Sequence, residues 1–526
     1  MQRLIGAGAL TVKSPALLLS SLPWLIGRGP SLGILSQMNG LSLGKKPAIV
    51  DRNGAISFRD LDKEANRIAR ALHDAGVGPG GKVAMLLRNG REMAAIVLGA
   101  QKSGIVACPL NTWAKTKELT AVAENLKADL LVYDTAHTVQ AACAARSGTK
   151  LVHVGGGEAL DGSITLERFQ SGKSSLPPLP IARDKGSAQI IIQTSGTTGT
   201  PKGAARDASA AGIGVLANLL GSVPYRRDDV VLCSSPLFHS FGLATFTFAT
   251  VLGATVVMPE RFDPEDCLRM IEEHQVTTAS LVPVMIRRIV SLPDATKEKY
   301  DLSSLRILMA SGSSLSLDLK KAATELFGEV LYDLYGSTEI GWVAIATPQT
   351  IKDRPKSVGK PVEGIEVAVF DKAGTKLPPN ETGELYVKSG VLFTGYTSGE
   401  TKDQREGLMS IGDLGRLDDE GYLYVDARSD DMAVIGGENV YPVEVEEVIE
   451  SMAGVTEVTV LPVPDEEFGQ VLAAFVVGTP SEAAIREHCA AELASYKVPR
   501  TVKILDELPR TSTGKVLKRE INTRSP

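Results

Sequence analysis

The stretch AQIIIQTSGTTGTPKG (residues 188–203) joins a run of β-branched residues directly to a loop of glycine, serine and threonine. The run at 188–192 predicts a short buried strand, because β-branched residues are enriched in strands. The loop would then start where a strand ends. Since ligands collect at such strand ends in α/β sheets, the stretch predicts a ligand-binding loop at the end of a sheet strand.

The composition of this loop suits a polyphosphate. Its glycines let backbone N–H groups converge, while its hydroxyl groups and the ammonium group of Lys202 add donors and positive charge. The spacing differs from that of a GxxxxGK[ST] phosphate loop, because Lys202 follows Pro201 and precedes Gly203. A flexible surface turn of the same composition stays open as the alternative.

Strands and helices alternate along most of the chain. In AIVDRNGAISF (48–58) a turn joins two strands, and Ser57 with Asp60 three residues later predicts the start of an amphipathic helix. Strand, helix and strand recur at a spacing that predicts parallel sheets covered by helices. Residues 383–426 change to short strands with glycine turns, which predicts a β-rich section.

The expected fold class is α/β with two domains. Residues 1–429 would form a large N-terminal domain of parallel-type sheets and helices with a β-rich subdomain. Residues 430–526 contain a helix, two strands and another helix, which predicts a small α+β C-terminal domain.

Charge and cysteine content exclude several classes of partner. The chain has 56 basic and 62 acidic residues and a formal net charge of −6, so it offers no positive field for nucleic acid. Its five cysteines lack CxxC spacing, and its six histidines form no HxxxH or HExxH pair. These patterns favour a reducing, cytoplasmic location without a zinc site or a disulfide framework.

The N-terminal segment 4–26 is mostly apolar, with Lys13 as its one charged residue. Pro15 and Pro23 interrupt it, and neither a membrane-spanning helix nor a signal peptide is well formed. We expect it to pack on the body of the protein. The alternative is peripheral membrane contact through residues 17–19 and 24–25.

Five further motifs follow the loop in order. They are PLFHSFG (236–242), MASGSSL (309–315), YGSTEIG (335–341), the long run SIGDLGRLDDEGYLYVDARSDDMAVIGGENVYPVEVEEVI (410–449) and LPRTSTGKVLKRE (508–520). Together they resemble the adenylate-forming superfamily of acyl-CoA synthetases, peptide-synthetase adenylation domains and luciferases. The long run and the last motif are most similar to those of bacterial medium- or long-chain fatty acyl-CoA ligases.

The resemblance implies a reaction in two steps. A carboxylate attacks the α-phosphorus of ATP to give acyl-AMP and pyrophosphate, and the thiol of coenzyme A then takes the acyl group. The family's phosphate loop matches residues 194–203, which would hold the β- and γ-phosphates. Mg²⁺ would be the metal, with Glu339 as its ligand and Thr338 as a phosphate contact.

The other ATP contacts follow from the same resemblance. Tyr335 would stack on adenine, Gly336 would leave room for the carboxylate or the base, and Asp413 would bind both ribose hydroxyls. Many relatives have threonine where this chain has Ile411, so the contact of that hydroxyl is missing. The full set implied for ATP is Thr194, Ser195, Gly196, Thr197, Thr198, Gly199, Lys202, Ser311, Gly312, Ser313, Tyr335, Gly336, Asp413 and Arg428.

The C-terminal domain would be mobile and serve both steps. Asp430 matches the hinge, and Lys515 matches the lysine that bridges the carboxylate and the α-phosphate. Lys515, Thr338 and Glu339 are therefore the implied catalytic residues. After rotation, Gly436 and Gly437 would line the passage for the pantetheine arm of coenzyme A.

The acyl site is implied at His239, Phe241 and Gly242, as substrate-binding residues. A general base is not needed, because a carboxylic acid with a pKa of about 4 is already ionised at neutral pH. The segments FHSFGLATFTFATVLG (238–253) and SLVPVMIRRIV (280–290) are candidates for an apolar lining. Trp342 is expected in the core, and the border of the pocket is the alternative.

Acid and acceptor stay open at this point. A medium- or long-chain fatty acid is the expected substrate, with an aryl or branched acid as the alternative. Coenzyme A is the expected acceptor, and a carrier-protein thiol is the alternative. A catalytically silent scaffold is disfavoured, because Lys202, Glu339, Asp413, Arg428 and Lys515 are all present.

Overall fold

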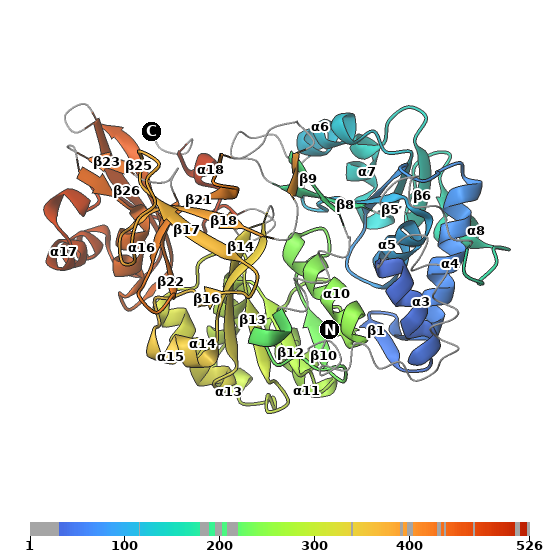
Figure 1. Ribbon diagram of the computed structural model, residues 1–526, viewed down its shortest axis with the longest axis horizontal. Helices are drawn as coiled ribbons and strands as arrows, with labels where there is room; N and C mark the ends of the chain where they lie inside the picture. Colours follow the sequence, from blue (N-terminus) through green and yellow to red (C-terminus); the bar gives the residue numbers. More distant parts are fainter. Residues whose placement is uncertain are drawn as a thin grey trace.

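The protein is described here by a computed structural model (Figure 1). It describes residues 31–114, 116–178, 189–194, 202–207, 219–337, 340–389, 393–396, 403–428, 433–435, 438–465, 469–510 and 516–522. Several predictions fall outside these ranges. They concern the apolar segment 4–26 with its membrane contact, Ser195, Gly196, Thr197, Thr198, Gly199, Thr338, Glu339, Asp430, Gly436, Gly437 and Lys515.

The larger sheet has nine strands, in the order β16-β15-β14-β13-β12-β10-β11-β1-β2. These strands are β16 (Lys360–Pro361), β15 (Gly341–Ala346), β14 (Leu331–Ser337), β13 (Ile307–Ala310), β12 (Thr278–Leu281), β10 (Val230–Cys233), β11 (Thr255–Val257), β1 (Pro47–Asp51) and β2 (Gly54–Ser57). The six strands from β14 to β1 are parallel, and β2, β15 and β16 are antiparallel to their neighbours.

The second sheet has eight strands, in the order β19-β9-β8-β4-β3-β5-β6-β7. These strands are β19 (Phe393–Tyr396), β9 (Lys202–Asp207), β8 (Gln189–Thr194), β4 (Val106–Pro109), β3 (Lys82–Leu86), β5 (Leu130–Asp134), β6 (Lys150–Val154) and β7 (Ile164–Thr165). Here β9 and β19 are antiparallel to their neighbours.

Both sheets are therefore mixed, where the sequence predicted parallel ones. The physical reason is loop length. Residues 195–201 are all that connect β8 to β9, and residues 338–340 are all that connect β14 to β15. A parallel connection needs a crossover of a dozen or more residues, so each of these pairs forms an antiparallel hairpin.

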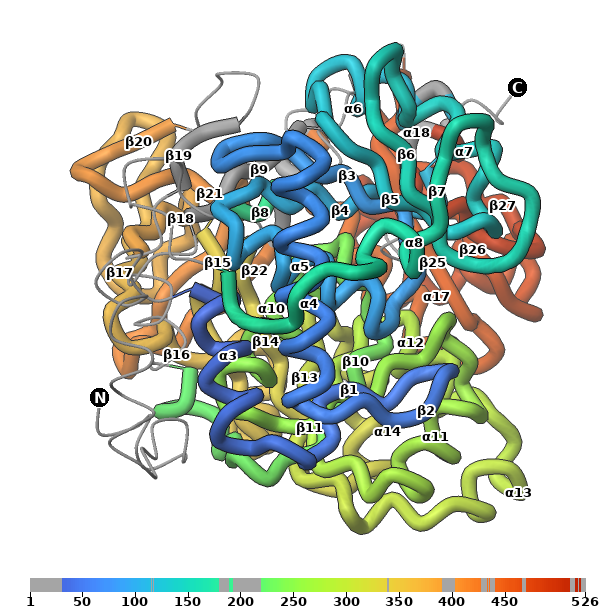
Figure 2. The backbone as a smooth tube through the Cα atoms, turned by 90° about the vertical axis from the view of Figure 1, so that its right-hand side faces the viewer, coloured from blue at the N-terminus to red at the C-terminus, as the bar shows by residue number. Residues whose placement is uncertain are grey.

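Helices fill the space between the two sheets and cover their outer faces. The middle layer contains α3 (Leu32–Ser42), α4 (Phe58–Asp74), α5 (Arg91–Ser103) and α10 (Ser240–Leu252). These helices share one hydrophobic core with both sheets. Figure 2 shows α3, α4 and α5 side by side. The far face of the nine-stranded sheet packs on α11 (Pro264–Glu273), α12 (Pro283–Val290) and α14 (Leu317–Phe327). The far face of the other sheet packs on α6 (Thr116–Leu126) and α7 (Thr138–Ala144). The described ranges also contain the short helices α8 (Leu166–Gln170), α13 (Asp294–Lys297) and α15 (Pro348–Asp353).

The predicted helix after Ser57 is confirmed as α4. The Ser57 hydroxyl accepts a hydrogen bond from the backbone N–H of Asp60 at 3.1 Å and donates one to its carboxylate at 2.7 Å. This reciprocal cap satisfies a backbone donor that the helix itself leaves unpaired. The chain leaves the helix at Gly76, whose φ of +76° lies in the left-handed region that glycine tolerates.

The β-rich section forms a five-stranded sheet of β17 (Glu366–Phe370), β18 (Gly383–Lys388), β20 (Gln404–Arg405), β21 (Leu408–Leu417) and β22 (Leu423–Arg428). Residues 433–522 build a smaller unit at the end of the molecule opposite the eight-stranded sheet (Figure 1). Its elements are β23 (Ala433–Ile435), β24 (Glu438–Val440), α16 (Pro442–Glu450), β25 (Val455–Asp465), β26 (Gly469–Gly478), α17 (Glu482–Glu492), β27 (Thr501–Ile504) and α18 (Lys518–Asn522). The predicted α/β class with a small α+β C-terminal unit is confirmed.

Among the helices of the described ranges, none is both long enough and apolar enough to cross a membrane.

Candidate active site

The predicted adenine-binding turn lies at the carboxyl end of β13. The Ser311 hydroxyl is buried and donates a hydrogen bond to the backbone carbonyl of Leu334 at 2.9 Å, which ties the turn to the neighbouring strand β14. Gly312 follows with a φ of +100°, in the left-handed region that disfavours side chains. The turn is therefore fixed at the edge of the sheet where ligands of α/β folds bind.

Tyr335 and Asp413 meet across two sheets. The Tyr335 hydroxyl donates a hydrogen bond to Oδ2 of Asp413 at 2.5 Å, and this bond links β14 of the nine-stranded sheet to β21 of the five-stranded sheet. In the five-stranded sheet, Asp413 lies directly opposite Arg428 of β22. The structure thus brings together the residues that the sequence separates by up to 117 positions, from Ser311 to Arg428. The side chain of Ile411 is buried in a hydrophobic cluster.

Gly336 occupies a place where no side chain fits. It faces Trp342 across the hairpin of β14 and β15, and the register shifts between Tyr335 and Gly336. A Cβ atom on Gly336 would overlap the carbonyl oxygen of Gly341 on the opposite strand. Glycine is thus required for the close approach of the two backbones that positions Tyr335.

Replacement of Gly336 by alanine is expected to destabilise the protein by about 1–3 kcal/mol, because the added methyl group forces the hairpin strands apart. Denaturant unfolding measures this loss, and the KM for ATP should rise in parallel. Gly78→Ala is the matched control, since a Cβ there meets no atom within 4 Å. Equal stability of the Gly336→Ala and Gly78→Ala variants would contradict the steric argument.

The phosphate loop of the sequence analysis connects β8 to β9. Thr194 and Lys202 are paired directly across this hairpin, so the ends of the loop are held together by the sheet. Since β4 pairs with β8 in parallel, the loop starts from the carboxyl end of β8 at the edge expected for a ligand. Its inner residues, 195–201, lie outside the described ranges.

His239 and Phe241 lie where α10 begins. The His239 ring packs against Phe238 with 4.4 Å between the ring centroids. Gly242 sits in the first turn of α10, where a Cβ atom would overlap the carbonyl oxygen of Pro236. The close contact between helix and preceding loop fixes the direction of α10, and it brings Phe241 over the nine-stranded sheet.

An apolar cavity of about 30 Å³ lies between α10 and this sheet, next to the predicted nucleotide residues. Its lining comprises Leu219, Tyr225, Val231, Phe241, Ala244, Thr245, Phe248, Thr278, Ser280, Met309, Leu334 and Trp342. Met309 lies two residues before Ser311, and Leu334 directly precedes Tyr335. The structure therefore places a small apolar cavity beside the residues predicted to hold adenine and ribose.

The sequence predicted this lining in part. Segment 238–253 supplies one wall through α10, as expected, but segment 280–290 supplies only Ser280, because α12 packs its apolar side chains into the core on the other face of the sheet. Trp342 was expected in the core, with the border of the pocket as the alternative, and it both packs against the core and lines the cavity. The sequence did not predict the lining residues Val231, Thr278, Met309 and Leu334. They lie on buried strands, and a run of buried strand residues looks the same in the sequence whether it borders a cavity or solid core.

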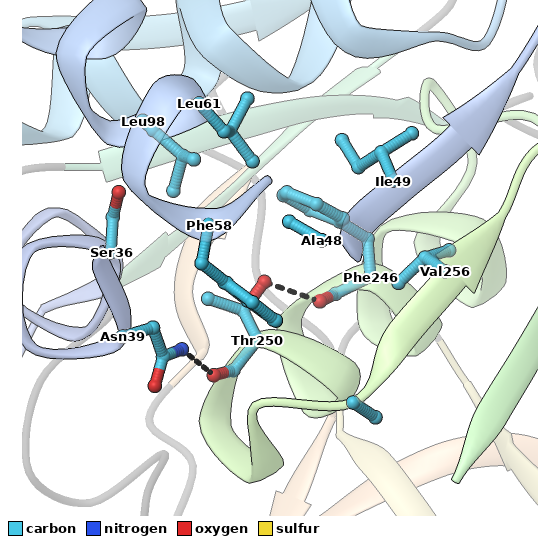
Figure 3. Close-up of a pocket in the computed structure, with 11 residues that line it drawn as sticks. Ser36, Asn39, Ala48, Ile49, Phe58, Leu61, Leu98, Phe246, Thr250 and Val256 are labelled. Carbon is cyan, nitrogen blue, oxygen red and sulfur yellow. Dashed lines mark hydrogen bonds between the residues drawn. The ribbon is translucent and has the colours of Figure 1, made fainter. Parts of the chain in front are cut away.

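A second cavity of about 10 Å³ lies among α3, α4, α10 and the strands β1 and β11 (Figure 3). Its polar groups bond to the protein itself: Asn39 Nδ2 donates to the carbonyl of Thr250 at 2.7 Å, and the Thr250 hydroxyl donates to the carbonyl of Phe246 at 2.8 Å. A space of this size holds at most about one water molecule. It is a packing gap in the core and holds none of the predicted site residues.

The described ranges offer few side chains that could act as a nucleophile or bind a metal ion. Burial raises the pKa of Cys108, Cys233 and Cys267 to about 12, so these thiols stay protonated and unreactive near neutral pH. No group of three or more His, Cys, Asp or Glu side chains within the described ranges could hold a metal ion. The predicted magnesium ligand Glu339 lies outside these ranges, between the paired residues Ser337 and Gly341.

Comparison with known proteins identifies the family. Residues 40–397 match the model of the AMP-binding enzymes, and residues 444–515 match the C-terminal domain of AMP-binding enzymes. The fatty acid–[acyl-carrier-protein] ligase ScoC of Streptomyces coeruleorubidus is 30% identical over 493 residues, covering 91% of this chain and 93% of its own. The long-chain-fatty-acid–CoA ligase FadD13 of Mycobacterium tuberculosis is 30% identical over 473 residues, covering 88% and 92%.

A solved structure gives the same result. The anthranilate CoA ligase AuaEII in complex with anthranoyl-AMP superimposes with a TM-score of 0.84 at 26% identity, covering 94% of this chain and 97% of its own. The similar proteins thus activate different acids and use different thiols. The chain belongs to the adenylate-forming superfamily of AMP-binding enzymes, within its ligases that join acyl or aryl acids to coenzyme A or to a carrier protein.

Proposed function

We propose that this protein is an AMP-forming acid–thiol ligase that activates a carboxylic acid as acyl-AMP and transfers the acyl group to coenzyme A. The observation that supports this most is the grouping of Ser311, Tyr335 and Asp413 where the nine-stranded and five-stranded sheets meet, beside an apolar cavity. Nucleotide and acyl group would then lie in contact, as the attack of a carboxylate on the α-phosphorus requires.

The described residues would bind and orient the nucleotide. Tyr335 offers its aromatic face to adenine, while Ser311 and Gly312 line the opposite side with small groups. The hydrogen bond from Tyr335 orients the Asp413 carboxylate through Oδ2. A carboxylate accepts about four hydrogen bonds, so the ribose hydroxyls find acceptor positions on the same group.

Magnesium fits the residues available for it. The ion prefers oxygen ligands and commonly binds through one or two carboxylates together with substrate phosphates, so a single Glu339 beside the hydroxyl of Thr338 suffices. When bound, it would neutralise phosphate charge. The glycine-rich loop with Lys202 would hold the same phosphates and release pyrophosphate.

The C-terminal unit would act as the mobile domain. We place the boundary at 429/430, with Asp430 as hinge, Lys515 serving adenylation and the turn at Gly436 and Gly437 serving the thiol. Ile435 and Glu438 are paired directly, so the two glycines alone connect β23 to β24. Because glycine has no side chain, a pantetheine arm could pass close to the backbone at these two residues.

The proposal also specifies the acid that is activated and the thiol that accepts the acyl group. A fatty acid and coenzyme A follow from the sequence resemblance, and ScoC, which by name uses an acyl carrier protein, makes the carrier thiol the second candidate acceptor. A cytoplasmic location follows from the dispersed cysteines and stays a prediction.

Incubation of the protein with ATP, Mg²⁺, coenzyme A and a panel of carboxylic acids is expected to yield AMP, pyrophosphate and one acyl-CoA, identified by mass. Parallel reactions with a phosphopantetheinylated carrier protein distinguish the two acceptors. Release of ADP and phosphate, or the absence of acid-dependent pyrophosphate exchange across aryl, short, medium and long acids, would refute the proposed function.

A further inference from the structure

The strand that carries Asp413 contains a bulge. On β18, Glu384 and Tyr386 are two residues apart. Their partners on β21, Leu414 and Ser410, are four residues apart, so β21 has two extra residues at this point. A bulge releases its residues from the regular alternation of side chains along a strand. The direction of the Asp413 side chain must therefore be set by contacts other than the sheet ladder.

Ser410 closes this bulge at its base. The residue is buried, and its hydroxyl donates a hydrogen bond to Oε1 of Glu384 on β18 at 2.6 Å. The backbone N–H of Ser410 donates to the carbonyl of Asp403 at 2.8 Å, on the other side of β21. Because Ser410 is held from both neighbouring segments, its Oγ atom has a fixed position.

The same Oγ atom also holds the backbone inside the bulge. It accepts a hydrogen bond from the backbone N–H of Gly412 at 3.2 Å. Gly412 has a φ of +75°, in the left-handed region that glycine tolerates. Asp413 is the next residue, so the bond between Ser410 and Gly412 fixes the peptide from which the carboxylate of Asp413 leaves the strand.

The direction of the Asp413 carboxylate matters because two groups are to share it. Its Oδ2 accepts the hydrogen bond from Tyr335 at 2.5 Å, and the ribose hydroxyls are proposed to use the remaining acceptor positions. Hydrogen bonds weaken steeply as their angle departs from the straight arrangement. A small rotation of the peptide at Gly412 would therefore weaken the bonds to ribose and leave the sheet in place.

We infer that Ser410 is a positioning residue for ribose recognition: its hydroxyl, held by Glu384, fixes the bulge that directs Asp413 at the nucleotide. This rests on the proposed function, because it assumes that Asp413 binds the ribose hydroxyls. Ser410 acts through Gly412 and Asp413, and its own partners are groups of the protein.

The test measures how well the protein distinguishes ATP from 3′-deoxy-ATP, which lacks one ribose hydroxyl. KM and kcat for pyrophosphate exchange are measured with both nucleotides and the most active acid of the panel. The wild type should prefer ATP about tenfold or more in kcat/KM, as expected for a hydrogen bond to a charged group. Ser410→Ala should raise the KM for ATP and reduce this preference to about threefold or less, with kcat nearly unchanged.

Ser357→Ala is the matched control. Ser357 is also buried, and its Oγ accepts a hydrogen bond from the backbone N–H of Gly359 at 3.0 Å and donates one to the carbonyl of Leu423 at 2.9 Å. Gly359 has a φ of +93°, so the local geometry is similar to that at Gly412. The Ser357→Ala variant loses the same kind of bonds away from Asp413, so its Tm should fall while its preference for ATP stays unchanged.

A conservative variant tests the hydroxyl itself. Ser410→Thr keeps the hydroxyl group, and a β-branched residue suits a strand. This variant should retain most of the preference for ATP over 3′-deoxy-ATP.

Each outcome decides the inference. An unchanged preference in Ser410→Ala overturns it and leaves the proposed function standing, as does a wild type that does not distinguish the two nucleotides. An equal loss in Ser357→Ala or in Ser410→Thr also overturns it, because the effect would then not depend on the Ser410 hydroxyl. Absence of acid-dependent pyrophosphate exchange in the wild type overturns both proposals. A loss of preference in Ser410→Ala alone, at a kcat close to that of the wild type, supports the inference.

Discussion

Replacement of Glu339 by alanine is expected to abolish acyl-AMP formation while the protein still folds. The carboxylate is the one proposed protein ligand of Mg²⁺, and without it the phosphate charge of ATP is not neutralised in the right place. The fold should survive, because Glu339 lies in a short connection between β14 and β15 whose flanking residues, Ser337 and Gly341, are paired through the sheet. Pyrophosphate exchange and the Tm are measured on the same preparation.

Two further variants make this test specific. Glu339→Asp keeps a carboxylate at a shorter reach, so it should recover part of the activity and need more Mg²⁺ for half-saturation than the wild type. Glu329→Ala is the matched surface control, since Glu329 is exposed and bonds to Lys352 at 2.8 Å. An active Glu339→Ala variant, or one that is inactive only because its Tm has collapsed, would remove Glu339 from the site.

Local features of the fold could be predicted because their causes are local. The cap and the buried face of α4 follow from spacing within one helix, and the hairpin of β1 and β2 follows from the turn residues Asn53 and Gly54. The direction of β9 and β15 was not predicted, because strand–helix alternation along the chain indicates parallel strands, whereas the connections before these two strands are too short for a crossover.

Contacts between distant segments could not be predicted from such patterns. The hydrogen bond from Tyr335 to Asp413 joins residues 78 positions apart, and only the folded sheets bring them together. Thr278 has the pattern of an ordinary strand residue in the sequence, and its place in the wall of the cavity is visible only once the neighbouring strands and α10 are in place. Family resemblance supplied the roles of site residues, but it carried no information on the shape of this cavity.

One ion pair between the two parts of the chain bears on the proposed domain rotation. Arg287 of α12 contacts Glu450 of α16 at 3.3 Å, and it also donates a hydrogen bond to Ser316 at 3.5 Å. Burial raises the pKa of Glu450, and the nearby Arg287 acts in the opposite direction. Partly exposed pairs of this kind contribute little, so the contact can break and re-form as the small domain turns.

The Lys515→Ala variant is expected to lose one half of the reaction and keep the other. Lys515 is proposed to stabilise the negative charge that gathers between the carboxylate and the α-phosphate, a contribution of about 3 kcal/mol or more for a well-placed group. Acyl-AMP formation should therefore slow by a factor of about 100 or more. Thioester formation from supplied acyl-AMP should stay nearly intact, because the proposed rotation removes Lys515 from the site before the thiol arrives.

The contacts on either side of Lys515 explain why the Lys515→Ala variant should lose adenylation activity without losing its fold. Arg510 and Val516 are bridged, and the backbone N–H of Leu517 donates to the carbonyl of Pro509 at 2.7 Å, so the segment that carries the lysine is closed at its base by bonds that do not involve its side chain. Lys503→Ala, on β27 of the same domain, is the control and should leave both steps unchanged.

Gly437→Leu should show the reverse pattern, with normal acyl-AMP formation and slow thioester formation, because a side chain would then obstruct the pantetheine arm. If Lys515→Ala and Gly437→Leu each slow the two steps equally, the domain does not alternate between two poses, and Lys515 has no special part in adenylation.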